Sequence, residues 1–291
     1  MNLQIPLVID MSDDESKSSN VADIANAVAA VAKEIPVYQD ALQPAAQEIG
    51  KALGTVAKLV NVALAPVSVL VWGYDQIREF TATKVAEKLR DIPTENIITP
   101  KPNIAVPAIE ALRYTGHEPS LSEMYANLLA TAMNKETANQ AHPSFVEIIK
   151  QITPDEAKIV NLFTDPNRLY PLLHIRQEYK QGNAEGLQGG YDIIPIFTDL
   201  GEVAQCEVQS NVPAYIVNLC RLGLCEIPPM NKYTDVDVYS KLKSSPILEA
   251  LKLSTEQNGL VYVEKEMRLS ITPFGHQFAQ ACTSVASGRA N

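Results

Sequence analysis

The fold of this chain of 291 residues is decided by residues 118–159, EPSLSEMYANLLATAMNKETANQAHPSFVEIIKQITPDEAKI. Ser120 with Glu123, and again Thr153 with Glu156, have the spacing of a capping box, in which two side chains satisfy backbone N–H groups at a helix start. Pro143 precedes the run SFVEIIKQI, where it predicts the first position of another helix because its missing N–H costs nothing there. The stretch therefore predicts consecutive helices.

Helical signals continue on the N-terminal side of this stretch. Residues 105–114 predict a helix with Pro107 in its first turn and Gly116 after its end. Residues 75–89 predict an amphipathic helix, because apolar positions recur there every three to five residues, at Ile77, Phe80, Val85 and Leu89. Since no convincing strand pattern occurs before residue 164, we expect an all-α region over 21–163. Residues 11–20, MSDDESKSSN, are polar and charged, and we expect residues 1–20 to form a mobile tail.

The pattern changes after residue 163. Residues 169–179 and 191–197 predict strands joined by a glycine-rich hairpin connector, 182–190, and residues 212–222 predict a helix. A strand at 224–229, a helix near 241–253, a tight hairpin within 260–271 with Glu266 near its turn, and a final helix capped by Thr272 follow. This order predicts a smaller winged-helix-like α+β module over 164–291. The expected fold class is therefore mainly α.

The charge balance excludes some broad classes of protein. There are 24 Lys and Arg residues against 34 Asp and Glu, a net charge of −10. This disfavours a general nucleic-acid binder, which needs positive surface over the phosphates. Four cysteines are too few for a disulfide scaffold. The first residues lack the basic region of a signal peptide. We therefore expect a cytoplasmic protein.

The longest apolar run, residues 52–74, has two interpretations. Its length is close to the roughly 20 residues that span a bilayer, and its one charge, Lys58, lies near its start. Pro66 divides the run into short halves, which favours a buried helical hairpin. A protein that is soluble at rest and inserts this segment into a membrane when triggered would satisfy both interpretations. The candidate membrane or partner segment comprises Leu53, Leu59, Val62, Leu64, Pro66, Val69, Leu70, Val71 and Trp72.

No candidate chemical site is evident in the sequence. Around the expected recognition helix, 212–222, the one cation Arg221 is outnumbered by acids, which disfavours DNA binding. The cysteines lack zinc-site spacing and favour buried thiols, and the histidines are scattered; His142 is expected to contact a helix start. The glycine-rich connector lacks the G-K-[ST] of a phosphate loop. We expect no catalytic, cofactor-binding or metal-binding residue, and no enzyme.

Four blocks of sequence together resemble a known family. They are LAPVSVLVWGYDQI (64–77), KLRDIPTENIITPKPNIAVPAIEALRYTG (88–116), the stretch 118–159 quoted above, and IVNLCRLGLCEI (216–227). They are similar to the bacterial Abi-alpha family, named for abortive infection, a phage defence in which the infected cell is sacrificed. The resemblance covers about residues 45–285 and brings no catalytic residues with it.

The resemblance implies a non-enzymatic antiphage protein. In this hypothesis the trigger is a protein partner or a phage-derived component, self-association is a candidate, and the segment 52–74 acts at the membrane on activation. A winged-helix transcriptional regulator, or a protein-interaction module, is the alternative function. No cofactor is expected.

Overall fold

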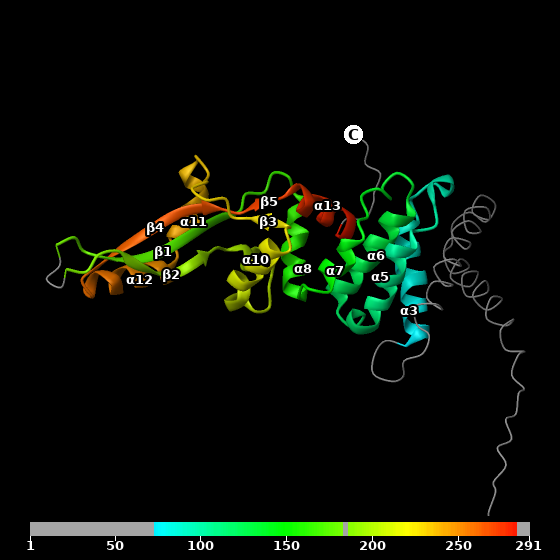
Figure 1. The fold of residues 1–291 in the computed structure, drawn as a ribbon, viewed down its shortest axis with the longest axis horizontal. Coiled ribbons are helices and arrows are strands. Elements are labelled where there is room, and N and C mark those ends of the chain that lie inside the picture. The colour runs from blue at the N-terminus through cyan, green and yellow to red at the C-terminus, as the bar shows by residue number, and fades with distance from the viewer. Residues whose placement is uncertain (1–72, 183–185, 284–291) are drawn as a thin grey trace, which may run out of the picture.

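The computed structural model describes residues 73–182 and 186–283, which we call the described chain. They form an elongated molecule (Figure 1). A helical body lies at one end, an arm built on a β-sheet lies at the other, and α10 (Val212–Arg221) lies between them. The predicted tail 1–20, and all but the last two residues of the apolar run 52–74, lie outside the described chain.

The helical body is formed mainly by residues 74–164. Apart from an isolated bridge between Ile97 and Asn134, the described part of 73–163 contains no strand, as the sequence predicts. Its elements are α3 (Tyr74–Phe80), the π-helical η1 (Thr81–Val85), α4 (Ala86–Leu89), η2 (Thr94–Asn96), α5 (Pro102–Thr115), α6 (Pro119–Met133), α7 (Ser144–Ile149), α8 (Pro154–Asn161) and η3 (Leu162–Thr164).

The helix predicted over 75–89 is confirmed, with one irregularity. The π-helical turn η1 joins α3 to α4 without a break in the chain direction. In a π-helical turn the backbone hydrogen bond joins residues five apart, so Phe80 and Val85 lie on the same side of the helix. Ile77, Val85 and Leu89 are buried and Phe80 packs against the same core. The five-residue gap in the apolar pattern thus has a structural cause.

Two predicted helix starts are wrong. α5 begins at Pro102 rather than 105, so Pro107 lies inside the helix. α6 begins at Pro119 with Glu118 as its N-cap, so Ser120 lies inside the helix and the predicted capping box of Ser120 and Glu123 is absent. The carboxylate of Glu123 binds the Lys88 ammonium of α4 instead. A charged partner brought close by the fold thus replaces the weaker local interaction.

The capping box at α8 is confirmed. The Thr153 hydroxyl accepts a hydrogen bond from the Glu156 backbone N–H at 3.2 Å, and the Glu156 carboxylate accepts one from the Thr153 N–H at 2.6 Å. At α7, His142 Nδ1 accepts the Ser144 N–H at 3.2 Å, which confirms the contact expected at a helix start. Two helix starts are therefore set by residues adjacent in sequence.

We expect Thr153→Ala to lower the free energy of unfolding by about 1 kcal/mol, because it removes the oxygen that caps α8. Ser120→Ala is the matched control, since Ser120 does not cap α6, and its effect should stay within about 0.5 kcal/mol. Urea denaturation of both variants measures the difference. Equal losses in the two variants would contradict the assignment of the caps.

The arm is a three-stranded antiparallel sheet. β1 (Pro171–Tyr179) is the central strand and pairs with β2 (Gly190–Phe197) on one side and β4 (Leu260–Arg268) on the other. The antiparallel pairing of β1 with β2 confirms the predicted hairpin across the glycine-rich connector. The helical elements η5 (Val236–Tyr239), α11 (Ser240–Lys243) and α12 (Pro246–Gln257) contribute to a small core on the sheet that contains Leu173, Ile175, Tyr239, Leu242 and Leu248.

The hairpin predicted within 260–271 is wrong. β4 runs unbroken through Glu266 and pairs along its whole length with β1, some 90 residues earlier in the chain. Glu266 carries no turn; Lys232 and Lys243 each bind its carboxylate at 2.6 Å. The following strand, β5 (Ser270–Ile271), pairs with β3 (Cys225–Glu226) instead. No turn-forming residue stands at 266, so long-range pairing decides the strand direction.

The last helix returns to the helical body. Thr272 caps α13 (Pro273–Cys282), as predicted, by accepting the Gly275 N–H at 2.9 Å. α13 packs against α6, and Phe278 contacts Phe145 of α7 with ring centroids 5.2 Å apart. One hydrophobic core extends from Ile77 to Cys282 and includes residues of α10. The C-terminal helix therefore completes the core begun by α3.

The chain between the sheet and the helical body forms the short α9 (Leu200–Val203), the 3₁₀ turn η4 (Gln209–Asn211) and α10. The described chain is helix-rich with a small three-stranded antiparallel sheet, in agreement with a mainly helical protein.

Candidate functional site

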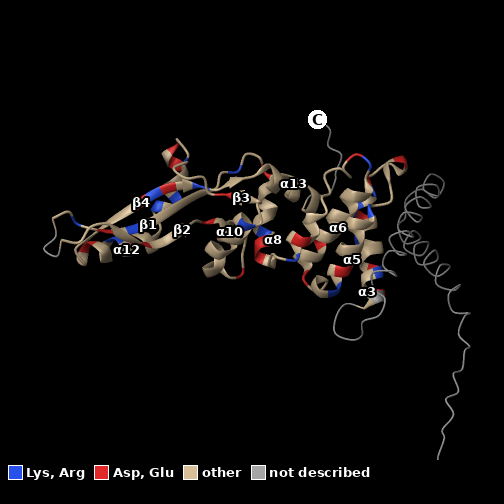
Figure 2. Cartoon of the chain, in the orientation of Figure 1, with Lys and Arg blue, Asp and Glu red and all other residues tan. Residues whose placement is uncertain are grey.

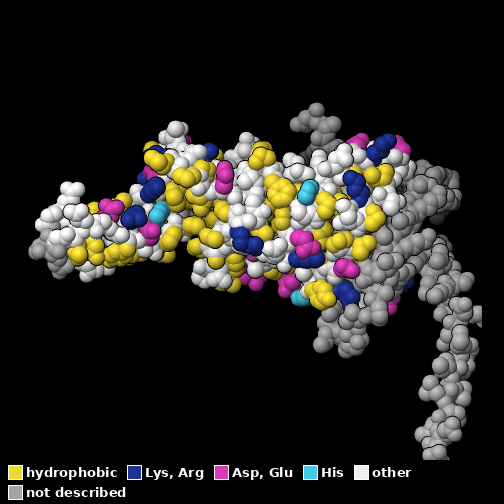
Figure 3. Space-filling model, viewed as in Figure 1, with side chains coloured by type: hydrophobic (Ala, Val, Ile, Leu, Met, Phe, Trp, Pro, Cys, Tyr) yellow, Lys and Arg dark blue, Asp and Glu magenta, His cyan; other side chains and the backbone are white. Residues whose placement is uncertain are grey.

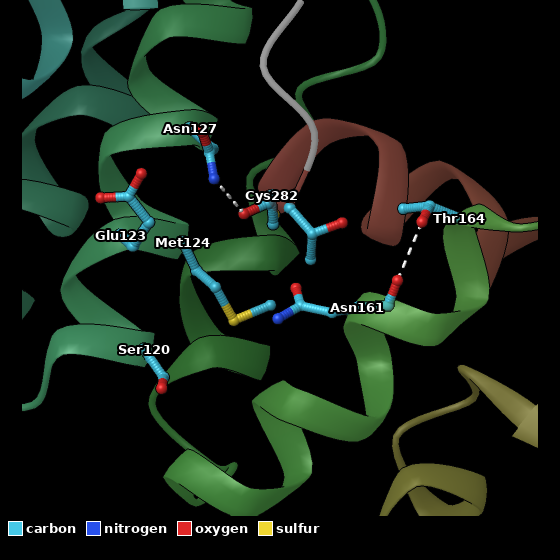
Figure 4. Close-up of a pocket in the computed structure, with 8 residues that line it drawn as sticks. Ser120, Glu123, Met124, Asn127, Asn161, Thr164 and Cys282 are labelled. Atoms are coloured by element: carbon cyan, nitrogen blue, oxygen red, sulfur yellow. Dashed lines mark hydrogen bonds between the residues drawn. The ribbon is translucent and has the colours of Figure 1, made fainter. Parts of the chain in front are cut away.

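A polar cavity lies where α6, the end of α8 and α13 meet (Figure 4). Its volume is about 240 Å³. In the close-up, the Met124 side chain reaches toward Asn161 across the space between the helices. The residues that line it are Ser120, Glu123, Met124, Asn127, Asn161, Thr164, Cys282 and Thr283.

Two polar side chains of α6 hold the end of α13 at this cavity. Asn127 Nδ2 donates to the Cys282 carbonyl at 2.9 Å, and the Thr131 hydroxyl donates to the Ala281 carbonyl at 3.0 Å. Carbonyls in the last turn of a helix have no partner within the helix, so buried ones need donors from elsewhere. Asn127 and Thr131 supply these donors from about 150 residues earlier in the chain.

The cavity is rich in hydrogen-bond acceptors. Glu123 contributes a carboxylate that is also paired with Lys88, whose side chain is 7% exposed. The C-terminal end of α13 adds the partial negative charge of its carbonyls. Asn127 Oδ1 is buried and has no hydrogen-bond partner among the described residues. A small group with N–H or ammonium donors fits this lining best.

The lining contains no activated nucleophile. Cys282 is fully buried, and burial raises the pKa of its thiol well above the usual value, which keeps it protonated. The Thr164 and Thr283 hydroxyls donate to backbone carbonyls at 2.8 and 2.6 Å. No base is hydrogen-bonded to Ser120 within the described chain.

A second polar cluster joins α8 to the segment before α10. The Asp155 carboxylate accepts the backbone N–H groups of Glu207 at 2.9 Å and Val208 at 3.0 Å, the Lys158 ammonium at 3.0 Å, and the Tyr215 hydroxyl at 3.3 Å. Burial alone would raise the Asp155 pKa, but these hydrogen bonds and Lys158 outweigh it and lower the pKa to about 2. Every donor comes from the chain itself, so the cluster is structural.

The exposed face of α10 does not resemble a DNA-reading surface. It presents Ala214 and Val217, and its cation Arg221 donates to the side chains of Asn218 and Gln151 at 2.7 and 3.1 Å. The nearby acids Glu202, Glu207 and Glu226 are exposed. Charges of both signs are interspersed over the described chain, and Figure 2 shows no continuous basic stripe along α10.

The candidate residues taken from the apolar run lie outside the described chain; they are Leu53, Leu59, Val62, Leu64, Pro66, Val69, Leu70, Val71 and Trp72. Among the helices of the described chain, none combines the length and apolar character needed to cross a membrane.

The cavity is not among the sites predicted from the sequence, although the sequence of α6 contains a signal for it. Ser120, Glu123, Asn127 and Thr131 follow one another at spacings of three and four residues, which places them on one face of α6. A polar stripe on a helix is normally assigned to solvent. Here Asn127 and Thr131 are buried, because a distant helix covers them.

Fold and cavity define a helix-rich protein with a small antiparallel sheet, whose C-terminal helix closes a polar cavity against α6. The family profile named "Abortive infection alpha" matches residues 73–282, which is most of the chain. The chain therefore belongs to this family, and the resemblance seen in the sequence is confirmed. All lining residues except Thr283 fall within the match.

Other comparisons add little. No curated protein matches the chain significantly. One similar solved structure is an uncharacterized protein from the hydrocarbon-degrading marine bacterium Alcanivorax borkumensis SK2. It is 14% identical, and the similarity covers 52% of this chain and 96% of that chain with a TM-score of 0.32. A score this low supports no conclusion about a shared fold.

Proposed function

We propose that this protein is a non-enzymatic component of abortive infection, which protects a bacterial population from phage by arresting or killing the infected cell. The family match over residues 73–282 is the observation that carries the proposal. The acceptor-rich cavity without an activated nucleophile is in agreement with a protein that acts by binding.

The proposal includes a sensing role for the helical body. The cavity lies beside the α6–α13 contact, where two hydrogen bonds hold the end of the last helix. A protein or phage-derived trigger that supplies donors to Glu123 and Asn127 would compete with, or reinforce, this contact. Binding energy would thereby be coupled to the position of α13.

We also propose that α9, α10, β3, β5 and α13 form a winged-helix-like module used for protein contact. The antiparallel β3–β5 pair follows α10, and residues 227–269, including α11, α12 and β4, would be an enlarged wing. Figure 3 shows hydrophobic surface along this arm, and its exposed apolar side chains include Tyr191, Ile247 and Leu253. These features favour a protein partner or a second copy of the chain over DNA.

We propose further that the apolar segment 52–74 carries out the killing step by acting at the membrane once it is released. It rests on the length and apolar character of the segment.

Plaque counts test the proposal. In a phage-sensitive bacterium that expresses the protein, we expect plaque numbers to fall at least tenfold for some phages of a broad panel, with loss of the infected cells. Unchanged plaque numbers across the panel, at confirmed expression, would refute the defence function.

A second arm of the same experiment tests the membrane step with Val69→Asp, read out with a membrane-potential dye during infection. An aspartate at the bilayer centre costs roughly 2.5–3.5 kcal/mol on insertion scales, so defence and the dye response should both weaken. Circular dichroism and gel filtration establish that the variant is folded. A folded variant that keeps full defence and the full dye response would reject the membrane step and leave the defence function intact.

A further inference from the structure

Two of the four cysteines lie in contact at the end of α10. The Sγ atoms of Cys220 and Cys225 are 3.5 Å apart, and both residues are free thiols. Cys220 is the penultimate residue of α10 and is half-buried, whereas Cys225 opens β3 and is buried. The pair lies outside the polar cavity and plays no part in the proposed trigger contact.

The backbone between them is held in a Schellman turn. Gly223 N–H donates to the Cys220 carbonyl at 2.9 Å, and Leu224 N–H donates to the Leu219 carbonyl at 3.0 Å. Gly223 has a φ of 75°, which glycine adopts without strain. This turn reverses the chain at the end of α10 and returns Cys225 beside Cys220. Their proximity is thus built into two ordered elements.

We propose that Cys220 and Cys225 form a redox-active dithiol, which a peroxide converts to a reversible intramolecular disulfide. A disulfide needs the sulfur atoms about 2.0 Å apart, so the two atoms must approach by about 1.5 Å. Side-chain rotation and a small shift of the turn supply this movement while α10 and β3 remain in place.

The two sulfurs have different roles in the reaction. The hydrogen bond from the Cys225 thiol lowers the pKa of Cys220 against the opposing effects of burial and Glu226, whereas the pKa of Cys225 is raised. Cys220 is also the more accessible of the two. Cys220 is therefore the attacking thiolate and Cys225 the resolving thiol.

The reaction balances with the peroxide as the named oxidant. The Cys220 thiolate attacks one peroxide oxygen, so that an S–O bond forms, the O–O bond breaks, and the leaving hydroxide becomes water by taking up a proton. Cys225 then loses its proton and attacks the Cys220 sulfenic acid, so that the S–S bond forms and the S–O bond breaks with loss of a second water. Two thiols are oxidised by two electrons, and hydrogen peroxide is reduced to two waters.

The disulfide would tie together elements that position the last helix. Cys225 pairs with Ile271 in the β3–β5 ladder, and the Leu224 carbonyl accepts the N–H of Thr272, the cap of α13. Cys206 and Cys282 serve as internal controls, because each is buried at a different place, Cys206 beside the Asp155 backbone and Cys282 at the end of α13.

The experiment uses the full chain, treated with hydrogen peroxide, then denatured and alkylated with N-ethylmaleimide. We expect two of the four thiols to be lost to alkylation, a monomer that has lost two hydrogens by mass spectrometry, and a linked pair of peptides containing Cys220 and Cys225. Reduction with dithiothreitol should make all four thiols available to alkylation again. Four thiols that remain alkylatable, or Cys220 oxidised to sulfinic acid without a link, would overturn the proposal.

Two variants assign the roles. Cys225→Ser removes the resolving thiol, so Cys220 should stop at a sulfenic acid that dimedone traps, whereas Cys220→Ser should leave Cys225 unreacted. Cys206→Ser is the matched control and should form the disulfide at the wild-type rate. In the wild-type protein, a disulfide that contains Cys206 or Cys282 would refute the assignment of the pair.

Discussion

Asp155→Ala should lower the free energy of unfolding by about 2–3 kcal/mol, because it removes the buried acceptor that several hydrogen-bond donors share. Asp155 is 5% exposed, and its carboxylate is the shared acceptor for two backbone N–H groups, the Lys158 ammonium and the Tyr215 hydroxyl. Alanine accepts none of these bonds, so the donors of Glu207 and Val208 would remain without a partner. Urea denaturation monitored by circular dichroism measures the loss.

Asp155→Asn is the matched variant for this prediction. The amide keeps the shape of the carboxylate and one acceptor oxygen, but it loses the charge that pairs with Lys158. We expect the free energy of unfolding of Asp155→Asn to lie between that of the wild type and that of Asp155→Ala. An alanine variant within about 0.5 kcal/mol of the wild type, the range of an ordinary surface substitution, would show that the cluster does not hold α8 to the segment before α10.

The same carboxylate predicts how stability depends on pH. The pKa of Asp155 falls from the ordinary 3.8 to about 2 in the folded protein. A depressed folded-state pKa gives stability that is complete above the unfolded value and is lost as the pH falls through the folded value. The wild type should therefore lose about 2 kcal/mol between about pH 4 and pH 2 that Asp155→Asn does not lose. Parallel pH profiles of the two proteins would contradict the assignment.

Phe278→Ala should lower the free energy of unfolding by about 3–5 kcal/mol. Phe278 is fully buried at the contact of α13 with the helical body, and its ring lies edge-on to Phe145 at 5.2 Å. The loss combines the transfer of apolar surface to water in the unfolded chain with the cavity left behind. Because α13 completes the core, we also expect greater protease sensitivity at the C-terminal end.

His276→Ala is the control on the same helix, since His276 is exposed two residues before Phe278. Its effect should stay within about 0.5 kcal/mol. Thermal unfolding of both variants gives the comparison. If Phe278→Ala is no more harmful than His276→Ala, α13 is not part of the core in solution.

Local chemistry made many helices predictable from sequence. The capping box of Thr153 and Glu156, the cap at Thr272 and the contact of His142 with a helix start involve groups only two or three residues apart, and the structure confirms each of them. The strands at 171–179 and 190–197 were predictable for the same reason, since their hairpin connects neighbouring segments. In each case the partners are close along the chain, so few other arrangements compete.

Predictions failed where a distant residue offered the better partner. Glu123 does not close a capping box, because α6 begins before Ser120 and the carboxylate binds Lys88, which the fold brings close to it. Glu266 does not mark a turn, because β4 continues through it and pairs along its whole length with β1. The cavity was missed because its walls come from α6, the α8–η3 segment and α13, which are far apart in sequence.

By itself the sequence determined the positions of most helices, the glycine-rich hairpin, the acidic character of the chain and the resemblance to its family, because these depend on composition and on neighbouring residues. The tertiary structure alone decided that α13 returns to α6, that Asn127 and Thr131 bond its last carbonyls, and that Asp155 gathers donors from three segments. These choices depend on burial: a polar group removed from water requires a partner, and only the folded chain determines which one lies within reach.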